Sequence, residues 1–310
     1  MIKRNRYNWI ILGWALVIMS IPGCLKERTE TATKGKIIIV VAESVFPLIK
    51  QEELRFEDLY PEAHIDLVSS TTREAITRLF NDTIQVIVTS RALNAEEREV
   101  AKKYNIKVEE YKIAIDGIAI LVNRQNPVAQ LRTTQLDSIF KGTIDEWSGV
   151  GGENTPIEVC LPDPNSGNYE VVGLKVLHGG KYATRTNVAK NSEDMLQFIA
   201  DHTNAIGMVG LNWIGTKKES VKVLELNDPS APDSLGIRDK FLGPFQAHVY
   251  RGYYPITRDI YMYSRADIYS VGSGFISFIT SAPGQQIVLN NGLVPATMPV
   301  RLVQLTNKDI

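Results

Sequence analysis

The sequence predicts an α/β fold in which short buried strands alternate with amphipathic helices. Residues 36–41 (KIIIVV) are a mostly β-branched run, which suits a strand buried on both faces of a parallel sheet. Similar runs recur along the chain, and the early ones lead into helix-start residues followed by apolar residues at helical spacing. This alternation favours a parallel sheet with crossover helices.

The predicted elements follow in order. The strands share a short apolar run and are residues 36–41, 65–68, 86–88, 118–122, 157–161, 206–209 and 221–224. The helices begin at a proline or a capping residue, and they follow Pro47, Thr71, Asn94 and Asn168 or span 192–200 and 283–289. Residues 227–243 are rich in Pro, Asp and Gly, and they predict a surface excursion.

Composition excludes several classes of function. A chain of 310 residues predicts one large or two ordinary domains. Lys and Arg total 34 against 35 Asp and Glu, so no basic surface for nucleic acid is expected. The two cysteines and four histidines lack metal-ligand spacing, so we expect neither a metal site nor a cofactor.

The N-terminus reads as a targeting segment. Residues 1–23 begin with basic residues and continue as a short uncharged apolar run, which is typical of an export signal. The run ends in Pro22-Gly23-Cys24, which resembles a bacterial lipobox with Cys24 as the lipidated residue. The alternative is a single-pass anchor with an incidental Cys24. Residues 24–35 predict a polar tether, which places the folded part beside a membrane and attached to it only by lipid.

The other cysteine is Cys160, which lies between Val159 and Leu161 in a predicted strand. With Cys24 lipidated, no disulfide within the chain is possible. We therefore expect Cys160 to be a buried, inert thiol.

Three strand-to-helix junctions carry small hydroxyl or amide residues, at 44–46, 69–72 and 165–168. In a parallel α/β sheet, such junctions lie at the carboxyl ends of the strands, where ligands bind. A helix N-terminus offers unpaired N–H groups and a partial positive charge, which together hold an anion. The sequence thus indicates a site for a small oxyanion, although such residues also cap helices with no further role.

Residues 139–147 (IFKGTIDEW) have the pattern I-F-x-G-x-I-x-x-W, and four further stretches stand out, at 88–97, 205–209 (AIGMV), 254–258 (YPITR) and 278–295. These stretches resemble segments of the phosphate-binding proteins of bacterial ABC importers. The resemblance implies a two-lobe periplasmic-binding-protein type II fold, each lobe a mainly parallel sheet flanked by helices, that closes on its ligand.

The resemblance also implies boundaries and a function. The chain should cross between lobes near 116–119 and 254–263, giving lobe 1 as 36–116 plus 258–310 and lobe 2 as 117–257. The implied protein is a monomeric, lipid-anchored receptor on the periplasmic or cell-surface side. It captures inorganic phosphate or a related oxyanion for an ABC permease, and it is not an enzyme.

The site residues implied by the resemblance lie on the three junctions and on the strand 86–88 loop. Two positions depart from the family pattern, because the family's proton-accepting aspartate falls on Ser90 and its arginine falls on Pro162. Arg91 and Asp163 are the candidate replacements for the charge and the acceptor. The predicted ligand-binding residues are Ser44, Val45, Phe46, Ser69, Ser70, Thr71, Ser90, Arg91, Asp163, Asn165, Ser166, Gly167 and Asn168.

Alternatives remain for individual residues and for the whole chain. Arg91 can instead be a salt-bridge partner, and Asp163 a turn residue between Pro162 and Pro164. The same fold can serve an oxyanion sensor or scaffold without a transport role. A hydrolase using Ser166 is disfavoured because the chain has no G-x-S-x-G elbow.

Overall fold

The structure, a computed structural model, describes residues 30–214 and 219–298. The predicted signal peptide at 1–23, Cys24, tether residues 25–29 and the end of the chain at 299–310 lie outside the described residues. Within the described ranges, none of the helices combines the length and the apolar character needed to cross a membrane.

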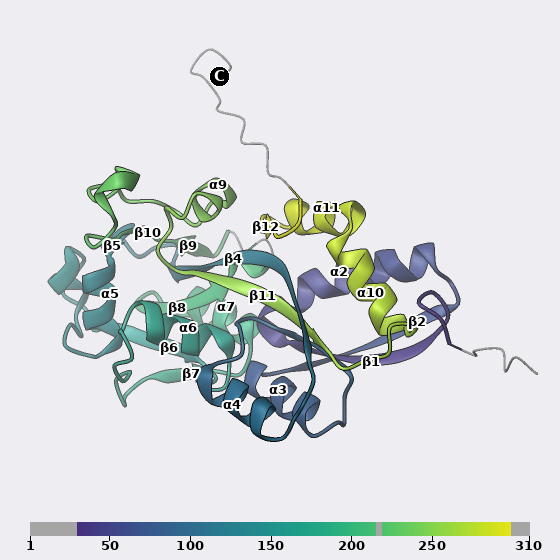
Figure 1. The fold of residues 1–310 in the computed structure, drawn as a ribbon. Coiled ribbons are helices and arrows are strands. Elements are labelled where there is room, and N and C mark those ends of the chain that lie inside the picture. The colour runs from purple at the N-terminus through teal and green to yellow at the C-terminus, as the bar shows by residue number, and fades with distance from the viewer. Residues whose placement is uncertain (1–29, 215–218, 299–310) are drawn as a thin grey trace, which may run out of the picture.

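The first half of the fold is a sheet covered by helices on both faces (Figure 1). Three parallel strands pair in the order β2-β1-β3, and they are β1 (Gly35–Ala42), β2 (Ala63–Ser70) and β3 (Val86–Thr89). The helices of this half are α2 (Phe46–Leu59), α3 (Thr72–Phe80), α4 (Ala95–Lys103), α10 (Val271–Thr280) and α11 (Ala282–Asn290). Figure 1 places α2, α10 and α11 on one face of the sheet and α3 on the other.

The second half has its own parallel strands, paired in the order β8-β6-β7. They are β6 (Glu158–Pro162), β7 (Asn187–Ala189) and β8 (Ala205–Gly210). The larger helices are α5 (Thr133–Phe140), α6 (Gly167–Lys175) and α7 (Ser192–Asp201). Short elements complete the chain: η1 (Glu43–Val45), β5 (Gln130–Arg132), η2 (Trp147–Val150), α8 (Leu211–Ile214), β9 (Val221–Val223), β10 (Glu225–Asn227), η3 (Asp233–Leu235), α9 (Gln246–Tyr250) and β12 (Val294–Pro295).

One strand belongs to both sheets. β4 (Glu109–Asn123) pairs with β11 (Thr257–Ser264) as far as Gly117 and with β8 from Ile118 onward. Both pairings are antiparallel, so each sheet is mixed where it meets the other. The Ile118 N–H donates to the Ile256 carbonyl at 2.8 Å, which places the two chain crossings side by side.

The alternation of strands and helices predicted from the sequence is confirmed, although the helices α5, α9 and α10 and the short strands β5, β7, β10 and β12 were not predicted. The strand predicted at 118–122 is part of a much longer β4, and β11 was not predicted. The excursion at 227–243 is partly packed, because Ala231 and Ile237 are buried. The Asn227 side chain donates to the carbonyls of Arg238 and Lys240, which closes that loop on itself.

The two largest hydrophobic clusters among the described residues support the proposed division of the chain, with Val294 of lobe 1 reaching into the second. One surrounds β1 and α2 and includes Ile39, Phe56 and Phe275. The other surrounds β6 and β8 and includes Phe140 and Trp147. We propose 36–116 plus 258–310 as lobe 1 and 117–257 as lobe 2, with the change of partner along β4 as the boundary.

Cys160 lies on β6 and is 1% exposed, as predicted. Burial raises the pKa of its thiol to about 12, so the reactive thiolate is almost absent at neutral pH.

Candidate functional site

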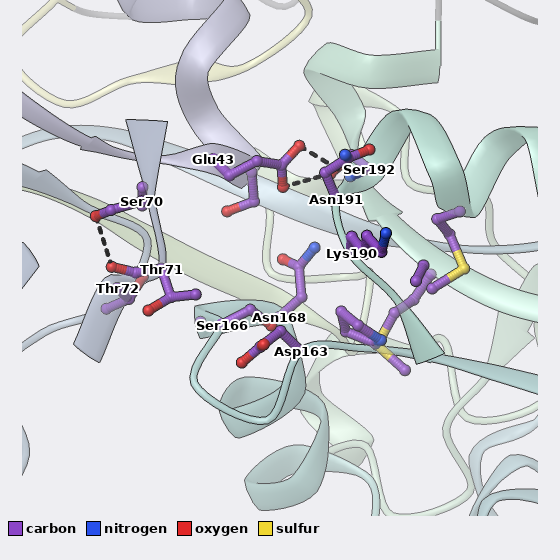
Figure 2. A pocket seen from close by; sticks show the side chains of 17 residues that line it. Glu43, Ser70, Thr71, Thr72, Asp163, Ser166, Asn168, Lys190, Asn191 and Ser192 are labelled. Carbon is purple, nitrogen blue, oxygen red and sulfur yellow. Dashed lines mark hydrogen bonds between the residues drawn. The ribbon is translucent and has the colours of Figure 1, made fainter. Parts of the chain in front are cut away.

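A small cavity of about 30 Å³ lies where the carboxyl ends of β1, β2 and β6 meet (Figure 2). Lobe 1 contributes Ala42, Glu43 and Ser44 and the 70–72 segment. Lobe 2 contributes Pro162, Asp163, Ser166, Gly167, Asn168, Ala189, Lys190, Asn191, Ser192, Met195 and Met208. A water molecule needs roughly 10–15 Å³ of such space, so the cavity suits a small ligand.

The cavity wall includes the N-termini of three helices. Thr71 caps α3 and Ser166 caps α6, where their hydroxyl oxygens accept the N–H groups of Glu74 at 3.3 Å and Tyr169 at 3.2 Å. Asn191 caps α7 by accepting the Asp194 N–H at 2.8 Å. Because helix N-termini carry a partial positive charge, their convergence makes the cavity favourable for an anion.

A buried ion pair lies against the cavity residues. Arg258 Nη2 lies 2.7 Å and its Nε 3.0 Å from Asp116 Oδ2, and both side chains are fully buried. Burial raises the pKa of Asp116, and the Arg258 guanidinium opposes that rise. Arg258 also donates to two cavity residues, to Ser44 Oγ at 2.9 Å and to Asn168 Oδ1.

Two carboxylates reach the cavity wall. Glu43 accepts the Ser192 N–H at 2.8 Å and its hydroxyl at 3.0 Å, which joins lobe 1 to the start of α7 in lobe 2 (Figure 2). Burial raises the pKa of Glu43, while its bonds to Ser192 and the charge of Arg258 oppose the rise. Asp163 Oδ1 accepts the Asn165 N–H at 2.7 Å, which is the turn contact that the sequence suggested. Asp163 nevertheless also lines the cavity.

The predicted site residues divide into two groups. Those that line the cavity are Ser44, Ser70, Thr71, Asp163, Ser166, Gly167 and Asn168. Those that do not are Val45, Phe46, Ser69, Ser90, Arg91 and Asn165.

Local geometry explains why four of the predicted residues do not line the cavity. Val45 is fully buried in the lobe 1 core and Phe46 packs against that core. Ser69 is exposed because neighbouring side chains on a strand point to opposite faces, and Ser70 takes the cavity side. Asn165 is exposed, and its carbonyl accepts the Arg73 N–H at 3.2 Å across the lobes.

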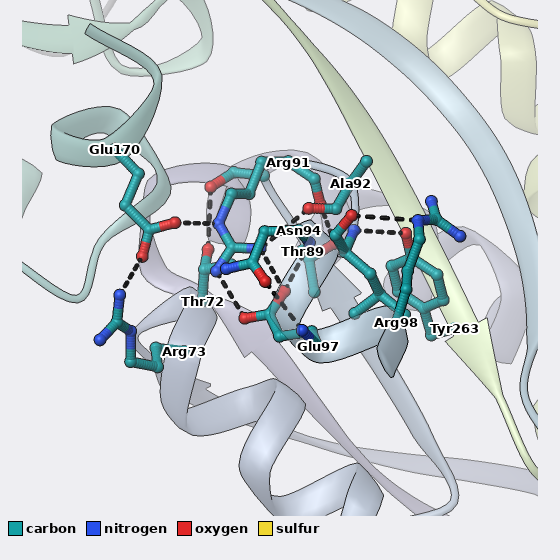
Figure 3. A network of polar contacts seen from close by, with 12 residues as sticks. Thr72, Arg73, Thr89, Arg91, Ala92, Asn94, Glu97, Arg98, Glu170 and Tyr263 are labelled. Carbon is teal, nitrogen blue, oxygen red and sulfur yellow. Dashed lines mark hydrogen bonds and ion pairs between the residues drawn. The ribbon is translucent and has the colours of Figure 1, made fainter. Parts of the chain in front are cut away.

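Ser90 lies beside the cavity residues Thr72 and Gly167, and Arg91 belongs to a network that joins the lobes (Figure 3). Ser90 is fully buried, and its hydroxyl lies 3.0 Å from that of Thr72. Arg91 makes a bidentate pair with Glu97 at 2.7 and 2.8 Å, and its Nε pairs with Glu170 of lobe 2. Arg91 is therefore a salt-bridge partner, the alternative that the sequence left open.

Sequence reasoning missed several residues of the site. Glu43, Lys190, Asn191 and Ser192 line the cavity, and Arg258 contacts two residues that do. The Asn191-Ser192 pair carries the same signal as the other three junctions, namely a small polar cap between a strand and a helix. No local pattern distinguishes Glu43, because its partner lies 149 residues away. Arg258 ends the 254–258 stretch noted in the sequence, but that stretch does not reveal its role, because its partner Asp116 lies 142 residues away.

Comparison with known proteins identifies the family. Residues 26–283 match the PBP superfamily domain. The chain belongs to that family. The predicted two-lobe periplasmic-binding-protein fold is thereby confirmed.

Relatives in this superfamily include proteins named for phosphate. The phosphate-binding protein PstS of Pseudomonas aeruginosa is 23% identical, over 96% of this chain and 94% of that protein. Protein SphX of Synechococcus elongatus is 25% identical, over 80% of this chain and 74% of that protein. A phosphate-bound structure from Clostridium perfringens aligns with a TM-score of 0.74, and an ABC-type phosphate transport receptor from Vibrio cholerae aligns with 0.65. Both solved structures are 23% identical, and both alignments cover 84% of this chain and 100% of the other.

Proposed function

We propose that this protein is an extracytoplasmic solute-binding protein that captures inorganic phosphate as a monomer and delivers it to an ABC permease. The observation that carries the proposal is the convergence of three helix N-termini and their hydroxyl and amide side chains on one small cavity between two lobes. The relatives named as phosphate-binding proteins and the phosphate transport receptor support the same ligand and role.

The expected affinity follows from the donors. A hydrogen bond to a charged group contributes about 1.5–3 kcal/mol. Five or six of these, less the costs of desolvation and closure, reach roughly −8 kcal/mol, which corresponds to micromolar binding. Closure about β4 and β11 would then exclude water and hold the ligand.

Titration calorimetry of the soluble chain with phosphate, sulfate, molybdate and tungstate tests the proposal. We expect one phosphate per chain with micromolar or tighter affinity and at least about tenfold weaker binding of the others, a difference of ~1.4 kcal/mol. No heat with any of the four anions would contradict oxyanion capture. Equal binding of sulfate or molybdate would overturn the choice of phosphate while leaving an oxyanion receptor.

Ser166 is proposed to bind the ligand rather than to attack it. Its oxygen caps α6, and no histidine is among the residues described here that line the cavity. We therefore expect no hydrolysis of phosphate esters by the purified protein, and turnover that is lost in Ser166→Ala would contradict this assignment.

The lipid anchor at Cys24 remains part of the proposal. Cys24→Ala is expected to leave the protein unprocessed or to release it from membranes. Fractionation and lipid labelling of both forms provide the test. Unchanged labelling of the variant would contradict the anchor.

A further inference from the structure

Arg258 occupies the point where the two lobes meet. It is the second residue of β11, and it lies opposite Asp116 of β4, immediately beside the crossing at Gly117. Its side chain is fully buried and does not line the cavity. It therefore acts on a ligand only through the groups that it holds.

All three nitrogens of the guanidinium have partners. Nε and Nη2 bind Asp116, and Nη2 also lies 3.3 Å from the Ser44 carbonyl. Nη1 donates to Ser44 Oγ at 2.9 Å and to Asn168 Oδ1. One side chain thus joins the shared strand to a cavity residue of lobe 1 and to a cavity residue of lobe 2.

These bonds fix the hydrogen-bonding polarity of the cavity. A serine hydroxyl can donate or accept, and an asparagine amide can offer either its oxygen or its nitrogen. Arginine has only donors. Because Ser44 Oγ and Asn168 Oδ1 accept from Arg258, the Ser44 hydroxyl hydrogen and the Asn168 NH₂ group are left to donate.

We propose that Arg258 is a positioning residue that turns Ser44 and Asn168 into donors for a largely ionised oxyanion. This inference rests on the proposed function. Asp116 neutralises the guanidinium, so Arg258 acts on the ligand through the orientation of two neutral side chains more than through net charge. Ser44 and Asn168 come from different lobes, so the complete arrangement exists only when the lobes are closed.

The backbone of Gly210 packs tightly against the Arg258–Asp116 ion pair. A Cβ at Gly210 would lie 2.5 Å from Arg258 Nη2 and 2.7 Å from Asp116 Oδ2. Gly210 pairs with Ile118, at the start of the lobe 2 part of β4. The absence of a side chain at Gly210 therefore allows the pair to sit against the crossing strands.

A double-mutant comparison separates positioning from general damage. Arg258→Lys keeps the charge but cannot contact Asp116, Ser44 and Asn168 together. We expect it to weaken phosphate binding by about tenfold or more in the wild-type background, a loss of at least ~1.4 kcal/mol. In a Ser44→Ala/Asn168→Ala background, the same change should cost less than about threefold, because the residues through which it acts are gone.

Arg265→Lys is the matched control. Arg265 is a partly buried arginine of lobe 1 that donates to the Leu79 carbonyl at 2.9 Å, away from the cavity. This variant should bind phosphate as the wild type does. The proposal would be overturned if Arg258→Lys lowered phosphate affinity equally in the wild-type and the Ser44→Ala/Asn168→Ala backgrounds, or lowered it in neither.

A second measurement requires no change at Arg258. The side-chain NH₂ resonances of Asn168, assigned by their loss in Asn168→Ala, should shift when phosphate is added to the wild type. Saturation by phosphate without such a shift would overturn the donor role. A wild type that binds no oxyanion would instead contradict the proposed function.

Discussion

Asp163 lines the cavity and uses only its Oδ1 in the turn contact with Asn165. Among the residues that the structure describes, no hydrogen bond engages its Oδ2. At neutral pH phosphate carries one or two protons and sulfate carries none. A carboxylate beside the ligand can accept a phosphate proton, whereas it repels sulfate, because a buried unpaired charge is costly.

Asp163→Asn is therefore expected to narrow the preference for phosphate over sulfate by about tenfold, or ~1.4 kcal/mol. Calorimetric titration with both anions measures the ratio. Asp201→Asn, at the distal end of α7, is the control and should leave the ratio unchanged. A strong preference that survives in Asp163→Asn would place the acceptor elsewhere, with Glu43 the next carboxylate to change.

Glu52 on α2 is fully buried, and neither of its carboxyl oxygens has a hydrogen-bond partner among the described residues. Burial raises the pKa of Glu52 from 4.5 to about 9. Below pH 4.5 the folded and unfolded chains both keep this proton. Between that pH and about 9 only the unfolded chain releases it, so the free energy of unfolding falls as the pH rises.

Glu52→Gln removes the group whose titration lowers the free energy of unfolding at high pH. We expect the free energy of unfolding of the variant to equal that of the wild type near pH 5 and to exceed it at pH 8 by on the order of 2 kcal/mol or more. Thermal denaturation at the two pH values is the measurement, with exposed Glu99→Gln as the control. A stabilisation of the same size at both pH values would show that the carboxyl does not titrate as inferred.

Single residues were predictable only where their role is local. The Asp163 turn depends on neighbours two residues away, and the sequence suggested it. Whether Ser69 or Ser70 faces the cavity depends on the orientation of the strand. Arg91 forms an ion pair with Glu170, which lies on α6 in the other lobe. The adjacent sequence therefore predicts neither the serine that faces the cavity nor the ion pair of Arg91.

At the scale of elements, the start of α6 lies in close contact with lobe 1. Gly167 is its first residue, and a Cβ there would overlap the Ser90 hydroxyl and lie 3.2 Å from Thr72 Oγ1. Glycine at this position therefore lets the α6 N-terminus approach the ends of β3 and α3.

Gly167→Ala should hold the lobes apart and weaken phosphate binding by more than tenfold, at least about 1.4 kcal/mol, with little change in melting temperature. Adding Ser90→Ala removes the overlapping oxygen and should recover part of the affinity. Titration of both variants measures the effect. If Ser90→Ala gives no recovery in the Gly167→Ala background, the loss does not arise from this contact.

Elements with local signals were predicted well. The capping box of α4 is present, because Asn94 and Glu97 each accept the backbone N–H of the other at 2.8 Å. Apolar runs marked β1, β3 and β8 because β3, β8 and the second half of β1 (39–42) are buried on both faces. β11 was missed because its residues alternate between buried and partly exposed, and it depends on pairing with the distant β4.

At the scale of the whole molecule, Glu170 adds a further connection between the lobes (Figure 3). Its carboxylate pairs with Arg91 and, at 3.1 Å, with Arg73, both from lobe 1. The side chains of Arg91 and Glu170 are 9% and 19% exposed, so solvent screens this pair less than an ordinary surface pair.

Glu170→Gln should leave phosphate association unchanged and speed its release by roughly three- to tenfold, because only the closed state loses contacts worth about 1 kcal/mol. Stopped-flow measurement of both rates provides the test. Glu74→Gln is the control, since Glu74 pairs with Arg78 within α3. A slower association with unchanged release would contradict a role in holding the lobes closed.

The inert thiol of Cys160 has a practical consequence for studies of closure. Cys24 is the only other cysteine in the sequence, and a soluble form that begins after it keeps Cys160 alone. Because maleimide dyes react with thiolates, a thiol that is 1% exposed with a pKa near 12 should stay unlabelled. Cysteine pairs introduced on the surface, one on each lobe, can then carry a donor and an acceptor dye without replacement of Cys160. Energy transfer between the dyes would report the opening and closing of individual molecules in real time.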